Sequence, residues 1–324
     1  FIVIFRLSML DLVEGGSTWD EVVALAQAVE AAGATIINTG IGWHEARIPT
    51  IATMVPRAAF AWVTRRMKGE VKIPLVTTNR INAPDVAEDV LARGDADMVS
   101  MARPFLDDAE FVNKAASGRA DEINTCIACN QACLDHIFER KTCSCLVNPR
   151  ACNETELKIL PAAAKKKVAV VGAGPAGLAF ATTAAERGHE VVLFERAAEI
   201  GGQFNLAKRI PGKEEFAETL RYFRRRLDAT GVKVKVSHRA TAEELAAGGF
   251  DHVALATGIL PRTPDIPGVD HPKVARYIDV IEGRREAGRR VAIVGAGGIG
   301  FDVAELLSHG GDQPNDIEHF RNEW

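Results

Sequence analysis

The sequence predicts an α/β protein in which half of a (β/α)8 barrel is followed by a cysteine-rich segment and Rossmann-like domains. Three observations predict this order. Strand-like and helical patterns alternate four times in the first hundred residues, five of the six cysteines lie between 126 and 145, and two glycine-rich turns begin at Gly172 and Gly295. We therefore expect four regions, namely the half barrel (1–118), the cysteine segment and linker (119–160), a first nucleotide-binding domain (161–288) and the start of a second (289–324).

The length and composition set limits on the class of protein. A chain of 324 residues suggests two or more domains, and a net charge of −4 gives no support for a nucleic-acid partner. The sequence contains no apolar run long enough to span a membrane and no signal peptide. Its six cysteines favour a reducing compartment. We therefore expect a cytoplasmic protein with no evident protein partner. Phe1 lies inside an apolar run and Trp324 follows a polar stretch, so we expect an internal fragment of a longer chain.

The first region alternates strands with helices. We expect strands at 1–8, 34–38, 73–77 and 96–100, and helices that begin at the capping box Thr18/Glu21 and that span 57–68 and 84–93. Each strand is followed by polar or charged residues, at the end where barrel enzymes place their chemistry. A doubly wound sheet is the alternative, but this region has no glycine fingerprint.

Four short motifs in this region resemble a known family. They are Phe5-Arg6-Leu7-Ser8, Gly42-Trp43-His44-Glu45-Ala46-Arg47, Thr78-Asn79-Arg80 and Ala102-Arg103-Pro104. They are similar to the C-terminal half of the flavin barrel in the Old Yellow Enzyme class, most closely in its 2,4-dienoyl-CoA reductase branch. The resemblance implies that Arg6 and Arg80 contact FMN and that Arg103 and the backbone of Ala102 hold its phosphate. Alone, each arginine would as easily be a solvated salt-bridge partner.

The same resemblance makes His44, Glu45, Ala46 and Arg47 the loop that binds an acyl-CoA substrate. His44 would polarise the thioester carbonyl or relay a proton, although an isolated histidine is more often structural. The family's proton-donating tyrosine has no match among the residues of this chain.

Four cysteines with the spacing C-x2-C-x3-C-x11-C predict an inorganic centre. Cys126, Cys129, Cys133 and Cys145 form a tight trio with a distant fourth member, which favours an iron–sulfur cluster, of the 4Fe-4S type by resemblance. A structural zinc site and free structural thiols are the alternatives. Cys143 is a conceivable substitute for Cys145, and Cys152 is interpreted as a spare thiol.

The first glycine-rich turn has the full context of a dinucleotide site. A buried strand at 168–171 leads into Gly172, Gly174, Ala176 and Gly177, and a second strand at 190–194 ends at Glu195, an acid suited to a ribose diol. The segment after this acid and the turn at 256–258 resemble flavoproteins that bind two dinucleotides, which implies FAD. By this resemblance Gln203, Lys213 and Ala240 line the FAD, while surface exposure or packing would equally explain Lys213 and Ala240. A helix at 213–228 is expected to present its arginines to solvent.

The second glycine-rich turn contains Gly295, Gly297 and Gly300, after an expected strand at 291–294. It would open a nicotinamide-nucleotide domain, and NADPH rests on resemblance alone. The resemblance then implies electron transfer from NADPH through FAD, the 4Fe-4S cluster and FMN to a 2,4-dienoyl-CoA, giving an enoyl-CoA in unsaturated fatty acid β-oxidation. The alternatives are an enoate reductase, an amine dehydrogenase of the trimethylamine type, or an inactive fragment that only binds flavin or cluster.

Overall fold

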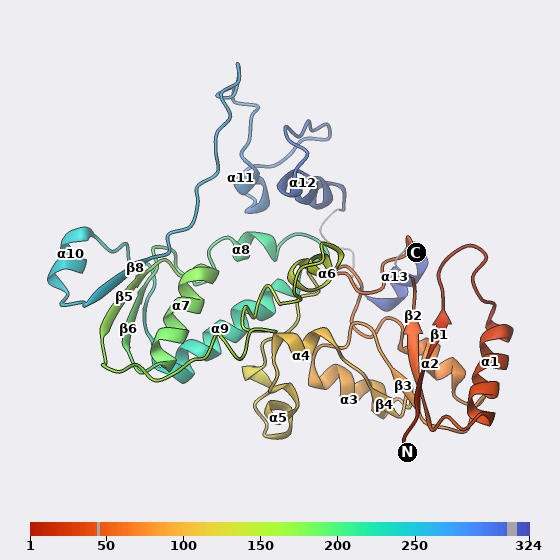
Figure 1. Cartoon of the computed structure of the whole chain (residues 1–324). Helices are drawn as coiled ribbons and strands as arrows, with labels where there is room; N and C mark the ends of the chain where they lie inside the picture. The colour runs from red at the N-terminus through yellow and green to blue at the C-terminus, as the bar shows by residue number, and fades with distance from the viewer. Residues whose placement is uncertain (44–45, 310–315) are drawn as a thin grey trace. The chain divides into compact units, whose positions relative to one another are not determined.

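The computed structural model describes residues 1–43, 46–309 and 316–324. The described chain forms two compact units (Figure 1). The first contains Phe1–Asn153 together with helix α13 (Ile317–Glu323), and the second contains residues 154–309. The cysteine segment thus folds with the barrel strands, and the first glycine turn folds in the other unit. No described helix has both the length and the apolar character that a bilayer crossing requires.

The first unit is built on a four-stranded parallel sheet. Its strands are β1 (Ile4–Leu10), β2 (Ile36–Ile41), β3 (Leu75–Thr77) and β4 (Met98–Val99), and they pair in the order β1-β2-β3-β4. The connecting helices are α1 (Trp19–Ala31), α2 (Ala61–Met67) and α3 (Pro84–Ala92). All four predicted strands and the three helices are present, so the predicted alternation is confirmed.

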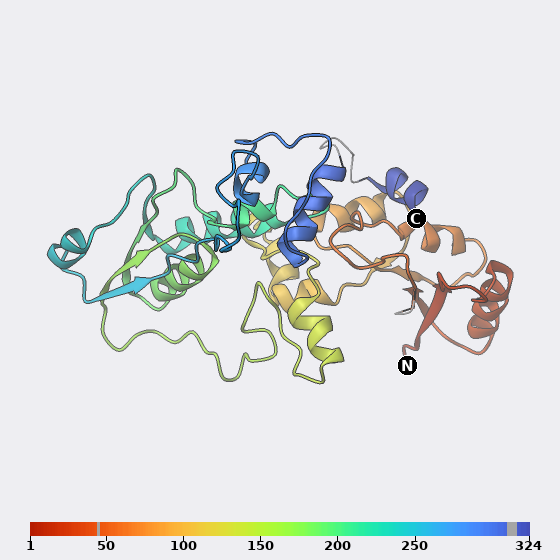
Figure 2. The same cartoon turned by 90° about the horizontal axis from the view of Figure 1, so that it is seen from above.

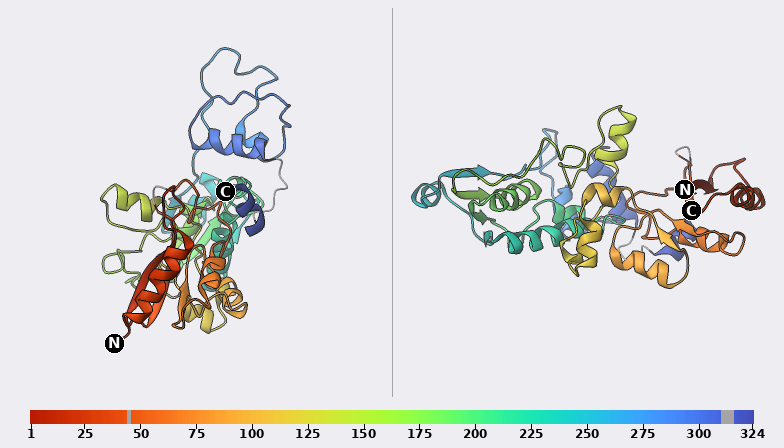
Figure 3. Two further views of the ribbon diagram at one scale, coloured as in Figure 1. Left: turned by 90° about the vertical axis from the view of Figure 1, so that its right-hand side faces the viewer. Right: turned by 60° about the horizontal axis from the view of Figure 1, so that its bottom comes forward.

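Helix α1 begins where the capping box predicts. The Thr18 hydroxyl accepts from the Glu21 backbone amide, and the Glu21 carboxylate accepts from the Thr18 amide at 2.8 Å. This reciprocal pair satisfies two amides that the helix leaves without an internal partner. The helix then runs beside β1 (Figure 3).

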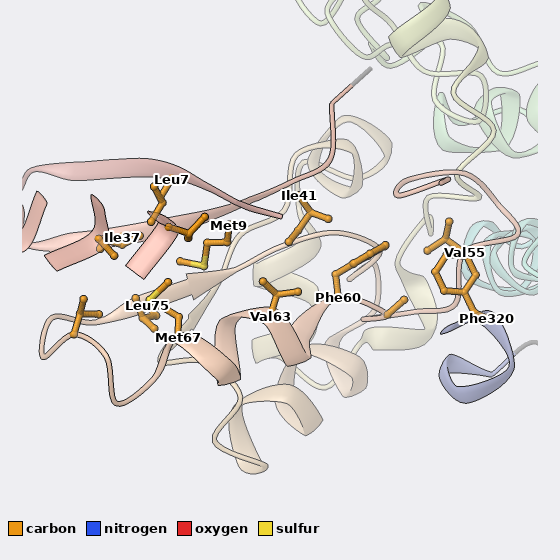
Figure 4. Packing of buried hydrophobic residues seen from close by; sticks show 14 residues of the cluster. Leu7, Met9, Ile37, Ile41, Val55, Phe60, Val63, Met67, Leu75 and Phe320 are labelled. Carbon is orange, nitrogen blue, oxygen red and sulfur yellow. The ribbon is translucent and has the colours of Figure 1, made fainter. Parts of the chain in front are cut away.

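The core of the first unit lies between the sheet and these helices. Leu7 and Met9 of β1, Ile37 of β2 and Leu75 of β3 point to the same side and pack against α1 and α2 (Figure 4). Helix α13, at the end of the chain marked C in Figure 2, adds to this core, because Phe320 meets the ring of Phe60 edge to face at 6.0 Å (Figure 4). The alternate strand residues therefore face the other side of the sheet, where a barrel would have its interior.

The segment after β4 consists of short helical pieces. They are α4 (Arg103–Asp107), α5 (Phe111–Ala116), a 3₁₀ turn (Ala120–Glu122), a π-helical turn (Gln131–Asp135) and α6 (His136–Phe138). A side-chain amide attaches this segment to the barrel half, because Asn82 donates to the Cys126 carbonyl at 2.7 Å. Within the segment, Asn124 donates to the Val147 carbonyl at 3.0 Å.

The second unit contains a parallel sheet in the order β7-β6-β5-β8. The strands are β5 (Lys167–Val171), β6 (Glu190–Phe194), β7 (Lys233–Lys235) and β8 (His252–Leu255). Helices α7 (Pro175–Glu186) and α9 (Phe216–Thr230) cover one face, and α10 (Ala242–Ala247) supplies Leu245 to the other. Helices on both faces of a parallel sheet are the doubly wound arrangement that the first glycine turn predicts.

The remaining elements of this unit are α8 (Phe204–Ala207), α11 (Tyr277–Ile281) and α12 (Gly298–Ser308). Helices α11 and α12 lie side by side and bury Ile281 and Val303 against Ile210 (Figure 3). The predicted strand at 291–294 is wrong, since these residues form no strand and Val294 is 80% exposed. A strand needs a hydrogen-bonded neighbour, and no described segment pairs with this one.

Candidate cofactor sites

The four predicted cluster ligands line one pocket in the first unit. Cys126, Cys129, Cys133 and Cys145 surround it, and Asp107 and Arg103 complete the lining. The spacing therefore brings the four residues to one place. Among the described residues, however, no three His, Cys, Asp or Glu side chains approach closely enough to hold a metal ion as they stand.

Burial governs the chemistry of this pocket. Desolvation, followed by the nearby Asp107 carboxyl, raises the pKa of both the Cys126 and the Cys145 thiols. Asp107 contacts the Cys145 sulfur through Oδ1, while its Oδ2 is buried without a hydrogen-bond partner. Buried thiolates and a buried carboxylate are costly unless a cation compensates their charge. The donor set thus fits a thiolate-bound inorganic centre.

A row of side chains crosses the inner face of the barrel sheet. Arg6, Asn38, Val76 and Met98 are neighbours in the strand register, one from each strand. Arg6 is the third residue of β1 rather than its last, because pairing continues to Leu10. The Asn38 Oδ1 atom beside it is buried with no hydrogen-bond partner. This orphaned acceptor, next to an exposed arginine, fits a polar ligand on this face.

The turn after β3 holds Arg80 in an unusual conformation. Arg80 and its neighbour Asn79 have φ values of +57° and +73°, a left-handed pair of non-glycine residues. Arg80 is 5% exposed, and its Nε donates to the Val55 carbonyl at 2.8 Å. The side chain is therefore not a solvated surface group. Such backbone conformations cost free energy and concentrate at ligand sites.

Arg103 connects the barrel to the cysteine segment. It begins α4 directly after Ala102, and its guanidinium contacts the Asn130 side-chain oxygen between Cys129 and Cys133. The resemblance assigns Arg103 and Ala102 to the FMN phosphate. The structure places this arginine at the cysteine pocket, and its contact with the FMN phosphate stays a prediction.

The expected substrate loop follows β2. His44 and Glu45 lie outside the described residues, Ala46 is half-buried and Arg47 is exposed. The preceding Trp43 donates from Nε1 to the Asp11 carboxylate at 2.9 Å. Asp11 also accepts from the Ser8 hydroxyl and from the Ser17 amide, so it ties the end of β1 to the loop.

The first glycine turn in the second unit is closely packed on one side and open on the other. A Cβ at Gly177 would lie 1.8 Å from the Gly172 carbonyl oxygen, and Gly172 itself has φ +105°. A Cβ at Gly174 would meet nothing within 4 Å. Ala176 lies in the first turn of α7, whose free amides and dipole favour an anion. This open backbone fits a pyrophosphate.

The other residues expected around FAD are placed as follows. Glu195 follows β6 and accepts from the backbone amides of Ala173 and Ala197, both at 2.8 Å. Gln203 donates to the Ile259 carbonyl at 3.2 Å. The arrangement gathers the acid, the glycine turn and the 256–259 segment around one region of the unit.

Two of the residues expected to line FAD make contacts with other parts of the protein. Lys213 forms an ion pair with Asp302 at 2.5 Å, and Ala240 packs against the sheet core. In α9, Arg221, Arg224 and Arg226 pair with Glu218, Glu199 and Glu186. Only Arg224 is exposed, whereas Arg221, Arg225 and Arg226 are half-buried, so the expectation of a solvated arginine face holds for Arg224 alone.

The second glycine turn repeats the first. A Cβ at Gly300 would lie 2.1 Å from the Gly295 carbonyl oxygen, and Gly295 has φ +124°. A Cβ at Gly297 would meet nothing within 4 Å at the start of α12. The turn therefore has the local geometry of a nucleotide site even without the predicted strand.

Sequence reasoning missed four residues of these sites. Asp11, Asn38, Asp107 and Asn130 are polar side chains in or beside apolar or cysteine-rich segments. The signal for Asn38 was its position after two isoleucines in a strand. For the others, the contacts join residues far apart in the sequence, which periodicity does not reveal.

Comparison with known proteins gives a class that agrees with these sites. Residues 1–122 match the NADH:flavin oxidoreductase / NADH oxidase family, and residues 166–321 match the pyridine nucleotide-disulphide oxidoreductase family. In these two regions the chain is similar to flavin-dependent oxidoreductases of the NADH oxidase and enoate reductase class. In particular, it combines an Old Yellow Enzyme-like flavin oxidoreductase region with a pyridine nucleotide oxidoreductase region.

Individual relatives share this organisation. The chain is 41% identical to a metal reductase of Desulforamulus reducens, over 98% of this chain and 48% of the relative. It is 31% identical to a cinnamate reductase of Clostridium sporogenes, over 94% of this chain and 46% of the relative. A 2-naphthoyl-CoA reductase complex superposes with a TM-score of 0.92 at 37% identity, over 96% of this chain and 48% of that one. The chain thus spans about half the length of these relatives.

Proposed function

We propose that the protein reduces a 2,4-dienoyl-CoA to an enoyl-CoA with electrons from NADPH, in the cytoplasmic degradation of unsaturated fatty acids. The main support is that a pocket lined by four cysteines lies in the same compact unit as the four-stranded parallel sheet. Both glycine turns, in the other unit, supply the open backbone that dinucleotides need. A structural relative that is titled a CoA-thioester reductase supports a thioester substrate.

The residues divide among four proposed cofactors. FMN would be held by Arg6, Arg80, Ala102 and Arg103, and a 4Fe-4S cluster by the four cysteines. FAD would be held by the turn at 172–177 together with Glu195 and Gln203. NADPH would be held by the turn at 295–300. When bound, the flavins supply hydride chemistry and the cluster supplies single-electron transfer. Lys213 would reach FAD only if it leaves Asp302, and Ala240 would contact FAD from its position beside the sheet core.

The chain's own groups would position substrate and charge. Arg80 is buried, and its Nε is fixed by the hydrogen bond to the Val55 carbonyl. Its side chain would therefore lose little conformational entropy when a ligand binds beside its positive charge. Asp11 fixes Trp43 at the start of the expected substrate loop. His44 in that loop would donate a hydrogen bond to the thioester carbonyl, with Glu45, Ala46 and Arg47 completing the loop.

An anaerobic assay of the protein at its natural length tests this proposal. NADPH oxidation would be followed with a 2,4-dienoyl-CoA, with cinnamate and with dimethylamine. Turnover of the dienoyl-CoA alone supports the proposal, and a product with one double bond fewer identifies the reaction. Flavin, iron and acid-labile sulfide would be measured on the same sample, and a preparation without iron would remove the cluster from the scheme.

An enoate reductase is the second candidate, because a cinnamate reductase is among the relatives. Both reactions add hydride to a conjugated carbon, and they differ in whether the acid carries CoA. Faster turnover of free cinnamate than of the dienoyl-CoA would select this candidate, and turnover of dimethylamine would select an amine dehydrogenase.

A further inference from the structure

Two cysteines outside the proposed cluster ligands lie next to each other. The Cys143 and Cys152 side chains interact directly. A side-chain-to-backbone hydrogen bond holds the two segments together, because the Ser144 hydroxyl donates to the Ala151 carbonyl at 3.0 Å. Ser144 and Ala151 are the immediate neighbours of the two cysteines, so this bond positions both.

The two thiols differ in access to solvent. Cys152 is exposed and Cys143 is half-buried. The exposed partner is therefore the one that a small oxidant meets first, and the half-buried partner lies behind it.

We propose that Cys143 and Cys152 form an oxidisable dithiol, a modification site separate from the cysteines of the pocket, that closes to a disulfide. The oxidant is a low-molecular-weight disulfide such as oxidised glutathione. Cys152 attacks it as a thiolate, a mixed disulfide forms and one small thiol leaves. The Cys143 sulfur, also deprotonated, then attacks the Cys152 sulfur and the second small thiol leaves, so two protein thiols are oxidised and one small disulfide is reduced.

The disulfide would act on the cysteine pocket through the chain. It closes a loop that runs from residue 143 to residue 152 and contains Cys145. The cross-link would reduce the number of conformations that this loop can adopt when it is detached from the barrel half. The effect of the disulfide on the cysteine pocket rests on the proposed cluster, whereas formation of the disulfide does not.

Mass spectrometry tests the disulfide directly. The protein at its natural length is incubated anaerobically with oxidised glutathione, alkylated and digested with trypsin. Cleavage after Lys141, Arg150 and Lys158 gives one peptide with Cys143 and Cys145 and another with Cys152. We expect these two peptides to be joined, with the link located at Cys143 by fragmentation and removed by dithiothreitol.

Three variants complete the test. Cys143→Ser and Cys152→Ser should each abolish the link and keep the iron content of the wild type. Ser144→Ala should slow closure several-fold, because it removes the bond that holds the segments together. A link to Cys133 or Cys145, a stable glutathione adduct on Cys152 that never resolves, or loss of iron in Cys143→Ser would each overturn the proposal.

Discussion

The Arg103 guanidinium contacts the Asn130 side-chain oxygen, and this contact joins the first residue of α4 to the loop between Cys129 and Cys133. Asn130 has φ +62°, a conformation that asparagine tolerates better than most residues. The loop that carries the cysteine trio is therefore fixed both by its backbone conformation and by a charged group from the barrel half.

Asn130→Gly should loosen this loop without straining it, because glycine accepts the left-handed conformation and lacks the side-chain oxygen. We expect a lower iron content per chain and faster iron loss to a chelator. Asn130→Asp retains an acceptor for Arg103 and should behave like the wild type. Equal iron retention in both variants would show that the contact has no role in holding the loop.

Arg80→Leu should lower both stability and FMN content. It leaves the buried Val55 carbonyl without its donor, a loss worth about 1–3 kcal/mol in the free energy of unfolding. The matched control is Arg224→Ala, since that side chain is 55% exposed and pairs with Glu199 at 3.5 Å, a pair worth at most about 1 kcal/mol. Urea unfolding and extracted FMN per chain measure the two effects. Full FMN content in Arg80→Leu would contradict the assignment of Arg80 to the flavin.

Gly177→Ala and Gly174→Ala should separate folding from cofactor binding. The first places a Cβ against the Gly172 carbonyl, so the turn must open and we expect a loss of roughly 1–3 kcal/mol or more. The second meets open space and should fold normally, while its methyl group obstructs the approach of a pyrophosphate. Thermal unfolding and FAD content measure these outcomes. A Gly174→Ala protein with full FAD would show that the cofactor binds elsewhere.

Asp11 should make the substrate loop sensitive to acid. Burial raises the pKa of this carboxyl, but hydrogen bonds from Ser8, Ser17 and Trp43 together outweigh it, so the net shift is below the ordinary value of 3.8. The folded state thus holds the proton less tightly than the unfolded state. The resulting stability is complete above pH 3.8 and is lost as the pH falls through the lowered pKa.

Asp11→Asn tests this dependence. Asparagine keeps one acceptor oxygen and removes the charge, so we expect lower stability at pH 7, by about 1–3 kcal/mol, and a flatter stability profile in acid. Urea midpoints measured over a pH series give both quantities. Parallel profiles for the variant and the wild type would assign the acid sensitivity to another group.

The sequence was sufficient for the features that local chemistry determines. The capping box at Thr18 and Glu21, the parallel strands and the two glycine turns each depend on a few adjacent residues. The site contacts that were missed join distant segments, such as Asn82 to the Cys126 carbonyl, and such amides have no periodic pattern. The strand at 291–294 was predicted from its apolar run, but a strand also needs a partner that its own sequence does not supply.

The two glycine turns have a consequence for how cofactor preference evolves. Because Gly177 closes on Gly172 as Gly300 closes on Gly295, one backbone shape serves both turns. Neither turn then distinguishes one dinucleotide from another, and discrimination must come from side chains beyond it, as Glu195 illustrates beside the first turn. Selection can therefore exchange one nucleotide for another by changing those peripheral groups while leaving both glycine frameworks intact.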